Sequence, residues 1–245
     1  MNTIVKVELT DICVGISHHI SNYHAIVKYC YENNLKLIKP LFKLTATHNN
    51  DKLIISDLSM YYDLDNITVN NNIFKVYDQE GENNITIIIP LSELLRRSPP
   101  FNTIKKNYNV SFPYNKSVLE IANNIVAKIG TEFMCIHVRR GDRIRNEQMN
   151  IDTQPPNILS IIKKNNASTV YIMTNRIKEL VGLRNNKEHT IYFFDDFEEL
   201  KSIEDNYYLF SIECAIMNIA SIKCSTFNTQ NNKYNCYLTN HGGSQ

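Results

Sequence analysis

The chain lacks three features that would each point to a particular class of protein. It has no run of about 20 apolar residues, the length that a membrane-spanning helix needs, and Met1–Lys6 does not resemble a signal peptide. Its net charge is only +1, so no basic surface for nucleic acid or lipid headgroups is indicated. We therefore expect a cytoplasmic protein that binds neither nucleic acid nor a membrane.

The cysteines also lack a pattern. There are six, and they are scattered without the spacing of metal ligands. Most lie in apolar runs, which is usual for reduced thiols in a cytosolic protein. We accordingly expect free, buried thiols and no metal at Cys13, Cys30, Cys135, Cys214, Cys224 and Cys236.

Strand-like and helix-like patterns alternate along the 245 residues in two series. The first series has a strand pattern at Ile4–Leu9, a helical pattern at Tyr23–Glu32 after a polar loop, and a second strand at Leu35–Leu44. Strands that alternate with helices at this interval favour parallel, doubly wound sheets. We predict an α/β fold of two Rossmann-like domains facing across a cleft, with boundaries at 1–113 and 114–245. Further strands are expected at Ile85–Pro90, Thr169–Met173, Thr190–Phe194 and Ile222–Phe227.

One apolar run stops abruptly in a cluster of charge. Phe133–Val138 has the composition of a buried strand in a parallel sheet, and Arg139 and Arg140 follow at its carboxyl end. Open α/β sheets bind their ligands at that end. Neighbouring strand residues point to opposite faces, so one arginine can face a ligand while Asp142 holds the other, and Gly141 permits the tight turn. A fixed guanidinium suits phosphate or pyrophosphate; a surface salt-bridge cluster is the alternative.

The residues His137-Val138-Arg139-Arg140-Gly141-Asp142 resemble the His-x-Arg-Arg-x-Asp motif of the GDP-fucose-dependent fucosyltransferases that form α1,2 and α1,6 linkages. The protein O-fucosyltransferases are more distant members of that group. The resemblance implies a GT-B-like arrangement, with the nucleotide-sugar donor on the C-terminal domain and the acceptor on the N-terminal domain. It places His137, Arg139, Arg140 and Asp142 in the donor site, with the two arginines as catalytic residues.

A helix and a strand near the C-terminus carry a second resemblance to the same family. Glu213 and the turn Ser225-Thr226-Phe227-Asn228-Thr229 are similar to an acidic helix residue followed by a Ser/Thr-Phe-Ser-Ser-like turn. The resemblance implies that Glu213, where the family usually has Asp, accepts hydrogen bonds from the two parallel donors of guanine. It also implies that phosphate lies against Ser225, Thr226, Phe227 and Thr229. A solvated position for Glu213 on its helix is the alternative.

The polar loop before the first helix corresponds to a Gly-rich loop of the fucosyltransferases. Of that loop the chain keeps Gly15 and has Ser17, His18 and His19 in place of the rest. By the resemblance, Gly15 and His18 belong to the donor site. Histidines that only hydrogen-bond within the protein are the alternative.

Two further strand ends carry polar residues. Thr174-Asn175-Arg176 stands where members of the family often have acidic residues, so carboxylates are replaced there by an amide and a guanidinium. Asp195-Asp196 follows another predicted strand, and at least one of the two is expected to cap the next helix.

The reaction that the resemblance implies is an inverting transfer of fucose from GDP-fucose to a hydroxyl of a glycan or protein. Charge grows on the departing diphosphate, and Arg139 or Arg140 stabilises that charge without a metal or other cofactor. Asp142 is assigned to orienting an arginine. Two alternatives stay open: a catalytically silent relative that binds a nucleotide or glycan, and a glycosyltransferase that uses another nucleotide sugar.

Overall fold

The computed structural model describes residues 3–8, 13–79, 85–90, 108–225 and 235–238; the side chains of Pro90, Asp142, Arg143 and residues 235–238 are not described. The chain divides into two compact units. Unit 1 comprises residues 1–116 and 204–208, and unit 2 comprises 117–203 and 209–245. Each unit combines helix with a sheet of mainly parallel strands, so the predicted α/β fold with two Rossmann-like parts is confirmed. The division into an acceptor side and a donor side stays a prediction.

Unit 2 is built on a five-stranded sheet. Its strands are β11 (Met134–His137), β12 (Thr169–Met173), β13 (Thr190–Tyr192), β14 (Ile222–Ser225) and β15 (Asn235–Leu238). The order across the sheet is β13-β12-β11-β14-β15, and only β15 runs antiparallel to its neighbour. Strands β12 and β13 therefore lie on one side of β11, and the chain then crosses to the other side, where β14 and β15 lie. This reversal is a topological switch point between β11 and β14.

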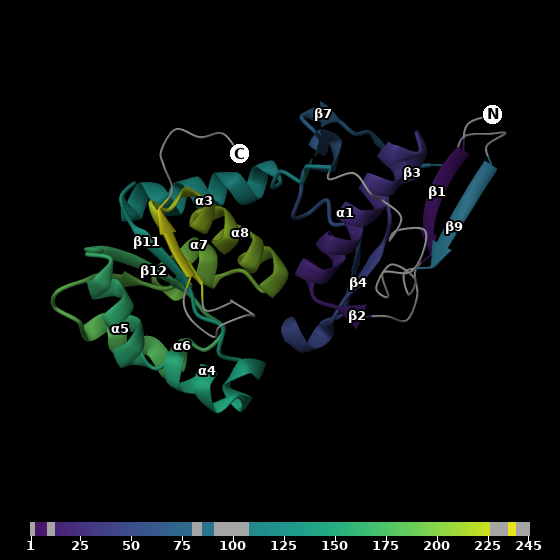
Figure 1. The fold of residues 1–245 in the computed structure, drawn as a ribbon. Coiled ribbons are helices and arrows are strands. Elements are labelled where there is room, and N and C mark those ends of the chain that lie inside the picture. Colours follow the sequence, from purple (N-terminus) through teal and green to yellow (C-terminus); the bar gives the residue numbers. More distant parts are fainter. Residues whose placement is uncertain (1–2, 9–12, 80–84, 91–107, 226–234, 239–245) are drawn as a thin grey trace. The chain divides into compact units, whose positions relative to one another are not determined.

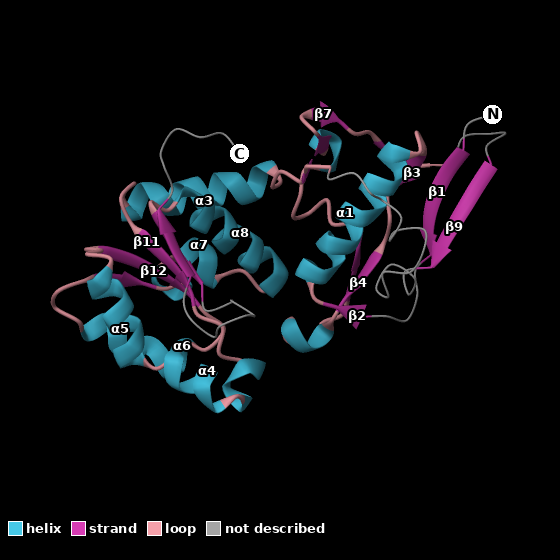
Figure 2. Ribbon diagram, viewed as in Figure 1, coloured by secondary structure: helices cyan, strands magenta, loops and turns pink. Residues whose placement is uncertain are grey.

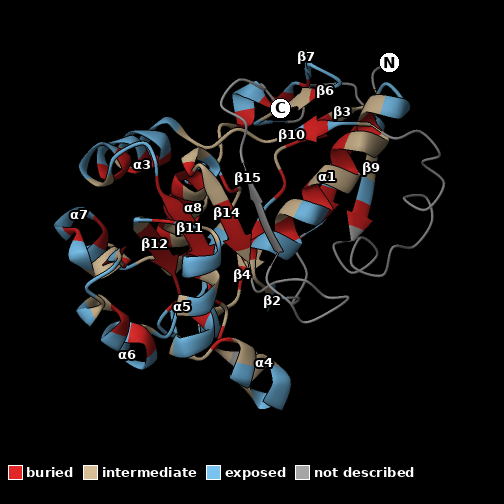
Figure 3. Cartoon of the chain, turned by 60° about the vertical axis from the view of Figure 1, so that its left-hand side comes forward, coloured by how far each residue is buried: buried red, intermediate tan, exposed pale blue. Residues whose placement is uncertain are grey.

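Helices cover both faces of this sheet (Figure 2). They are α3 (Lys116–Ile129), α4 (Glu147–Asp152), α5 (Pro155–Lys164), α6 (Ile177–Leu180), α7 (Glu198–Lys201) and α8 (Asn206–Ile219), with 3-10 turns at Asp142–Arg145, Val181–Asn185 and Phe194–Asp196. Met134 and Ile136 of β11 are fully buried against Ile158 and Ile162 of α5. Buried residues gather on the central strands and on the helix faces turned toward them (Figure 3). Burial on both faces explains why β11 and β12 have nearly continuous apolar sequences.

Unit 1 repeats the same strand order in a four-stranded sheet, β8-β3-β1-β9, in which every pair is parallel. These strands are β1 (Thr3–Glu8), β3 (Lys36–Ile38), β8 (Val76–Tyr77) and β9 (Ile85–Pro90). Two small sheets accompany it, one of β2 (Cys13–Val14), β4 (Phe42–Leu44) and β5 (Ile54–Ser56), the other of β6 (Thr68–Val69), β7 (Asn72–Ile73) and β10 (Val110–Ser111). Helix α1 (Ile16–Glu32) buries a face that includes Tyr23, Ile26 and Cys30. Short 3-10 turns lie at Ala46–His48 and Leu64–Asn66.

A short segment far along the sequence, 204–208, completes unit 1. The Tyr61 hydroxyl donates to Asp205 Oδ2 at 2.9 Å, and the Tyr207 hydroxyl donates to the Thr45 carbonyl at 2.8 Å. The backbone N–H of Asn206 donates to Asn49 Oδ1 at 2.7 Å. These bonds tie the start of α8 to the loops around β4 and β5.

The predicted strands agree with the structure at β1, β9 and β12, whose bounds differ from the prediction by at most one residue. The single strand predicted at Leu35–Leu44 is wrong, because β3 and β4 are separated around Pro40, which cannot donate a ladder hydrogen bond. The predicted polar loop before the first helix is also wrong, since α1 already begins at Ile16.

The expectation of six free, buried thiols is wrong in two respects. Cys224 is disulfide-bonded, and the residue opposite it in the register of β14 and β15 is Cys236. Cys13 is free but exposed, whereas Cys30 and Cys135 are free and buried as expected. No helix within the described residues has both the length and the apolar character needed to cross a membrane.

Gly130 provides a test of how α3 ends. Its φ is +98°, in the left-handed region, and its N–H donates to the Val126 carbonyl at 2.8 Å. Both features are typical of the glycine that ends an α-helix. Gly130→Ala should lower the free energy of unfolding by about 1 kcal/mol, because a side chain disfavours this φ. An added Cβ would meet no atom within 4 Å, so backbone strain alone is measured.

Gly182→Ala is the matched control for urea unfolding. An added Cβ also meets nothing within 4 Å there, but the backbone φ lies outside the left-handed region. Gly182→Ala should have the same free energy of unfolding as the parent. If both variants lose the same free energy of unfolding, the loss in Gly130→Ala does not come from the left-handed φ.

Candidate functional site

The carboxyl ends of β12, β11 and β14 lie level with one another. His137, the last residue of β11, is in register with Met173 at the end of β12 and with Ser225 at the end of β14. The segments that follow these strands therefore start at the same edge of the sheet, and the switch point lies between β11 and β14. This edge is where open α/β sheets bind ligands.

Arg140 is buried at this edge and makes a network of charge-assisted hydrogen bonds. Its side chain is 5% exposed, and Nε donates to Glu179 Oε2 at 2.6 Å. Nη1 donates to the carbonyl and hydroxyl oxygens of Thr153 at 2.8 and 2.7 Å, and Nη2 donates to Asn150 Oδ1 at 2.9 Å. The guanidinium is thus held between α4 and α6, as one of the two arginines was predicted to be held. The carboxylate that pairs with it is Glu179. The role predicted for Asp142 stays a prediction, because its side chain lies outside the described part.

Asn175 packs against Gly141 in the segment that follows β11, residues 139–145, which we call the arginine loop. Its Oδ1 lies 3.4 Å from the Gly141 N–H, and a Cβ added to Gly141 would stand 2.7 Å from Asn175 Nδ2. No larger residue fits at 141 without moving this amide. Where the fucosyltransferases often have acidic residues, this chain has Asn175 and Arg176. The neutral amide of Asn175 contacts the backbone of the loop at Gly141.

His137 and Arg139 alternate with the fully buried Ile136 and Val138 around the end of β11. Both polar residues are half-buried, and burial followed by the positive charge of Arg139 lowers the pKa of His137 to about 4. The imidazole is therefore neutral at pH 7. Its ring centroid lies 5.9 Å from that of Phe210 on α8.

The remaining residues predicted for this edge are only partly described. Ser225 is half-buried at the end of β14. The backbone of Asp142 begins a 3-10 turn, but its side chain lies outside the described part. Thr226, Phe227 and Thr229 lie outside the described residues altogether, so the phosphate-binding turn stays a prediction.

Glu213 is buried beneath the sheet rather than solvated on its helix. The residue is 6% exposed, and Oε1 accepts a hydrogen bond from the Tyr171 hydroxyl at 3.1 Å. Burial raises the pKa of this carboxyl to about 8, although the bond from Tyr171 acts in the opposite direction. The solvated alternative is therefore wrong, and the carboxyl lies against the middle of β12. Its predicted contact with guanine stays a prediction.

Gly15 and His18 belong to unit 1. Gly15 is the N-cap of α1, and His18 is exposed in its first turn. His19, the neighbouring histidine, is fully buried and donates from Nε2 to the Lys43 carbonyl at 2.7 Å. Desolvation lowers the pKa of His19, so its ring is a neutral structural group. The structural alternative therefore holds for His19, while the donor-site role of Gly15 and His18 stays a prediction.

Sequence reasoning missed the side chains that fix the site. Asn150, Thr153 and Glu179 had no motif or spacing that marked them, because their common partner Arg140 is 10 to 39 residues away. One of Asp195 and Asp196 was expected to cap the next helix. Asp196 Oδ2 accepts the Phe193 N–H at 2.7 Å and so caps the 3-10 turn Phe194–Asp196, whereas α7 has no side-chain cap. Both aspartates also pair with Arg184. In the part of the chain that is described, no three His, Cys, Asp or Glu side chains gather as metal ligands would.

Comparison with known proteins identifies the fold class. No family model matches the sequence, and no curated protein sequence matches it. The fold is that of GT-B fucosyltransferases with known structures, at sequence identities that show the fold alone.

Two named proteins are among these structures. POFUT1 in complex with GDP has a TM-score of 0.55 at 8% identity, covering 91% of this chain and 90% of that chain. POFUT1 in complex with GDP-fucose has a TM-score of 0.53 at 7% identity, with the same coverage. The fucosyltransferase NodZ from Bradyrhizobium has a TM-score of 0.51 at 8% identity, covering 98% of this chain and 100% of that chain.

Arg140→Ala should destabilise unit 2 by about 2 kcal/mol, because it leaves the buried Thr153 and the partly exposed Glu179 and Asn150 without their shared donor. Urea unfolding measures the loss. Arg145→Ala removes an exposed arginine of the same loop and should change stability by less than about 0.5 kcal/mol. Equal stability of the Arg140 variant and the parent would show that the network contributes nothing.

Glu213 should make stability fall as pH rises. The folded protein keeps the carboxyl proton up to a pKa of about 8, whereas the unfolded chain releases it near 4.5. The stabilisation is therefore fully present below pH 4.5 and lost as pH approaches 8. Between pH 5 and 8 the contribution should fall by roughly 3 kcal/mol.

Glu213→Gln should abolish this dependence and raise the melting temperature at pH 8, since the amide oxygen can still accept from Tyr171. The exposed Glu147→Gln is the control, and it should retain the slope of the parent. If the stability of Glu213→Gln falls with pH as steeply as that of the parent, Glu213 is not the group that causes the pH dependence.

Proposed function

We propose that the chain is a glycosyltransferase that moves fucose from GDP-fucose to a hydroxyl of a glycan or protein, with inversion and without a metal. The observation that carries the proposal is the arginine loop at the switch point of unit 2, in a fold shared with proteins crystallised with GDP and GDP-fucose. Diphosphate is the part of such a donor that a guanidinium recognises best.

Arg139 is the residue to which we assign the chemistry. We do not assign it to Arg140, because the buried guanidinium of Arg140 already donates to Glu179, Thr153 and Asn150. Arg139 is two residues after His137, which ends β11 level with the end of β14. Neighbouring residues of an extended chain point to opposite sides, so Arg139 is expected to face away from the partners of Arg140. The negative charge on the diphosphate grows as the bond to the sugar breaks, so a guanidinium beside it stabilises the transition state more than the bound donor.

The neutral His137 fits a role in binding rather than in adding charge. Because the pKa of His137 is about 4, its imidazole stays neutral across the physiological pH range. A neutral imidazole can donate one hydrogen bond to a ligand oxygen without competing for the charge of Arg139. Donor binding should accordingly show no titration near pH 6.5, the ordinary pKa of histidine.

One observation favours a second candidate, a protein that binds the nucleotide sugar without transferring it. Among the described side chains of residues 137–141 and 174–180, Glu179 is the sole carboxylate, and it is paired with Arg140. That part of the edge therefore offers no free carboxylate to take the proton of an acceptor hydroxyl.

Thermal-shift measurements with GDP, GDP-fucose, GDP-mannose and UDP-sugars test the donor. GDP and GDP-fucose should raise the melting temperature, since a ligand at 100 times its Kd adds about 2.7 kcal/mol of stability. Absence of a shift with every guanine nucleotide would reject the proposal. Release of GDP from GDP-fucose only after an acceptor is added would exclude the silent binder.

Arg139→Ala should lower turnover about a hundredfold and weaken GDP binding, because the transition state loses its main cationic contact. The melting temperature without ligand should stay close to that of the parent, unlike that of Arg140→Ala. Arg145→Ala is the charge-matched control and should bind GDP as the parent does. If Arg139→Ala binds GDP and turns over like the control, the site lies elsewhere.

A further inference from the structure

Arg176 stands beside the arginine loop although it comes from another strand. It lies three residues after Met173, which is paired with His137 at the end of β11, and the Val138 N–H still donates to the Met173 carbonyl at 2.8 Å. The next contact between the two segments is that of Asn175 with Gly141 at 3.4 Å. Arg176 is the residue after Asn175, so its backbone lies at the carboxyl edge of the sheet, next to the arginine loop.

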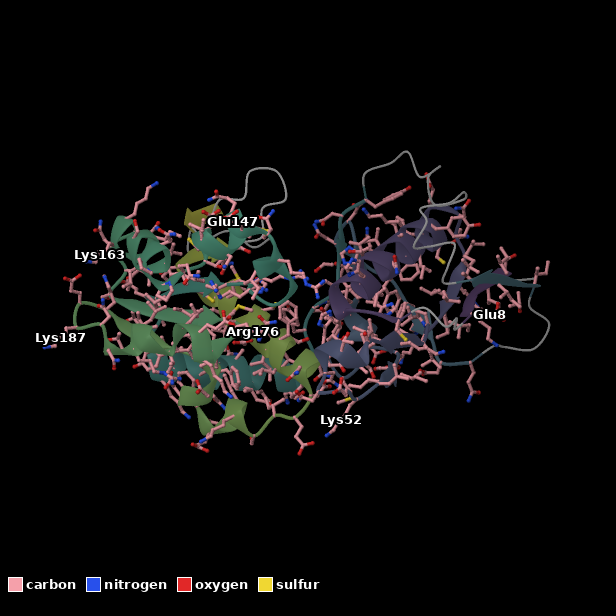
Figure 4. The ribbon with its side chains drawn as sticks, turned by 90° about the horizontal axis from the view of Figure 1, so that it is seen from below. Glu8, Lys52, Glu147, Lys163, Arg176 and Lys187 are labelled. Atoms are coloured by element: carbon pink, nitrogen blue, oxygen red, sulfur yellow. The ribbon has the colours of Figure 1, made fainter. Side chains whose placement is uncertain are left out.

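The backbone of Arg176 is fixed, but its guanidinium is not buried. The Arg176 N–H donates to Thr174 Oγ1 at 3.1 Å, and Thr174 is itself 7% exposed. The side chain of Arg176 is 50% exposed (labelled in Figure 4). Its position therefore comes from the turn after β12, while the charged head is open to solvent and to a ligand.

The carboxylate next to Arg176 is already engaged. Glu179 lies 3.9 Å from Arg176, measured from Oε1 to Nε, which is too long for a hydrogen bond. The other oxygen of Glu179 binds Arg140 at 2.6 Å. One carboxylate is thus shared by two arginines, and its closer bond is to the buried one. The guanidinium of Arg176 keeps most of its donors available.

A diphosphate ester carries about one negative charge on each phosphate and more acceptor oxygens than a single guanidinium can bind. Arg139 reaches the edge from β11, and Arg176 reaches it from β12. Two arginines on neighbouring strands can contact oxygens on both phosphates, which supplies the charge that a divalent cation supplies in other nucleotide sites.

We propose that Arg176 is a second phosphate-binding arginine, which contacts the diphosphate of the ligand held at the carboxyl edge of unit 2. This inference rests on the proposed function, in which that ligand is a nucleotide diphosphate sugar. It assigns a binding role to a residue that replaces a carboxylate expected at this strand end. The role is in affinity for the diphosphate, and Arg139 remains the catalytic residue.

Isothermal titration of the full chain with GDP, guanosine and inorganic pyrophosphate tests the proposal. Arg176→Ala should weaken binding of GDP and of pyrophosphate about tenfold, which is the loss expected for one charge-assisted bond. It should leave guanosine binding unchanged. Arg176→Lys should recover part of the affinity, and the difference between Arg176→Ala and the parent should shrink as salt concentration rises.

Lys178→Ala is the matched control. Lys178 is an exposed cation in α6, the helix whose N-cap is Arg176, and residues two apart at a helix start do not face each other. It should bind all three ligands like the parent. Because Arg176 is half exposed, the melting temperature of Arg176→Ala without ligand should equal that of the control.

The outcomes separate this inference from the proposed function. A parent that binds pyrophosphate but not GDP would reject the guanine-nucleotide donor, and the pyrophosphate titrations would still decide the role of Arg176. A parent that binds GDP with no difference between Arg176→Ala and Lys178→Ala would overturn the inference and leave the donor proposal standing. A parent that binds neither ligand would overturn both.

Discussion

A buried guanidinium must be surrounded by acceptors, and Arg140 meets this requirement by joining three segments that are distant in the sequence. Moving a charge out of water is costly unless hydrogen bonds replace the lost hydration. Glu179 on α6, Asn150 on α4 and Thr153 at the C-cap of α4 replace it. Because all three must reach one planar group, the end of β11 and both helices have little freedom to shift. The backbone of Arg139 is also restrained, because Arg139 is bonded directly to Arg140.

The sequence was sufficient where local composition decides the structure. Strands buried on both faces have continuous apolar runs, so β12 was predicted at Thr169–Met173 with its observed bounds. The two-residue period of a strand was enough to predict that Arg139 and Arg140 have different surroundings. The end of β11 was also predicted to within one residue, at Val138 rather than His137, because the apolar run gives way to charged residues there.

Long-range pairing decided the features that could not be predicted. Nothing near Glu179 marks it as the partner of a residue 39 positions earlier. The same holds for the buried His19, whose acceptor is a carbonyl 24 residues away, and for the contact of Asn175 with Gly141. Cys224 was misjudged because the prediction used only the surrounding apolar residues, whereas the register of β14 and β15 sets a second cysteine opposite it. Each of these depends on the folded topology, which local patterns do not contain.

The completion of unit 1 by residues 204–208 has a consequence for how the chain matures on the ribosome. Asp205 and Asn206 supply partners to Tyr61 and Asn49, yet they are synthesised long after the rest of that unit, which ends at Lys116. At 5 to 20 residues per second, the delay is roughly 5 to 20 s. During that interval the nascent unit exposes the loops around β4 and β5 without their final partners, so it is open to chaperones and proteases until unit 2 has largely emerged.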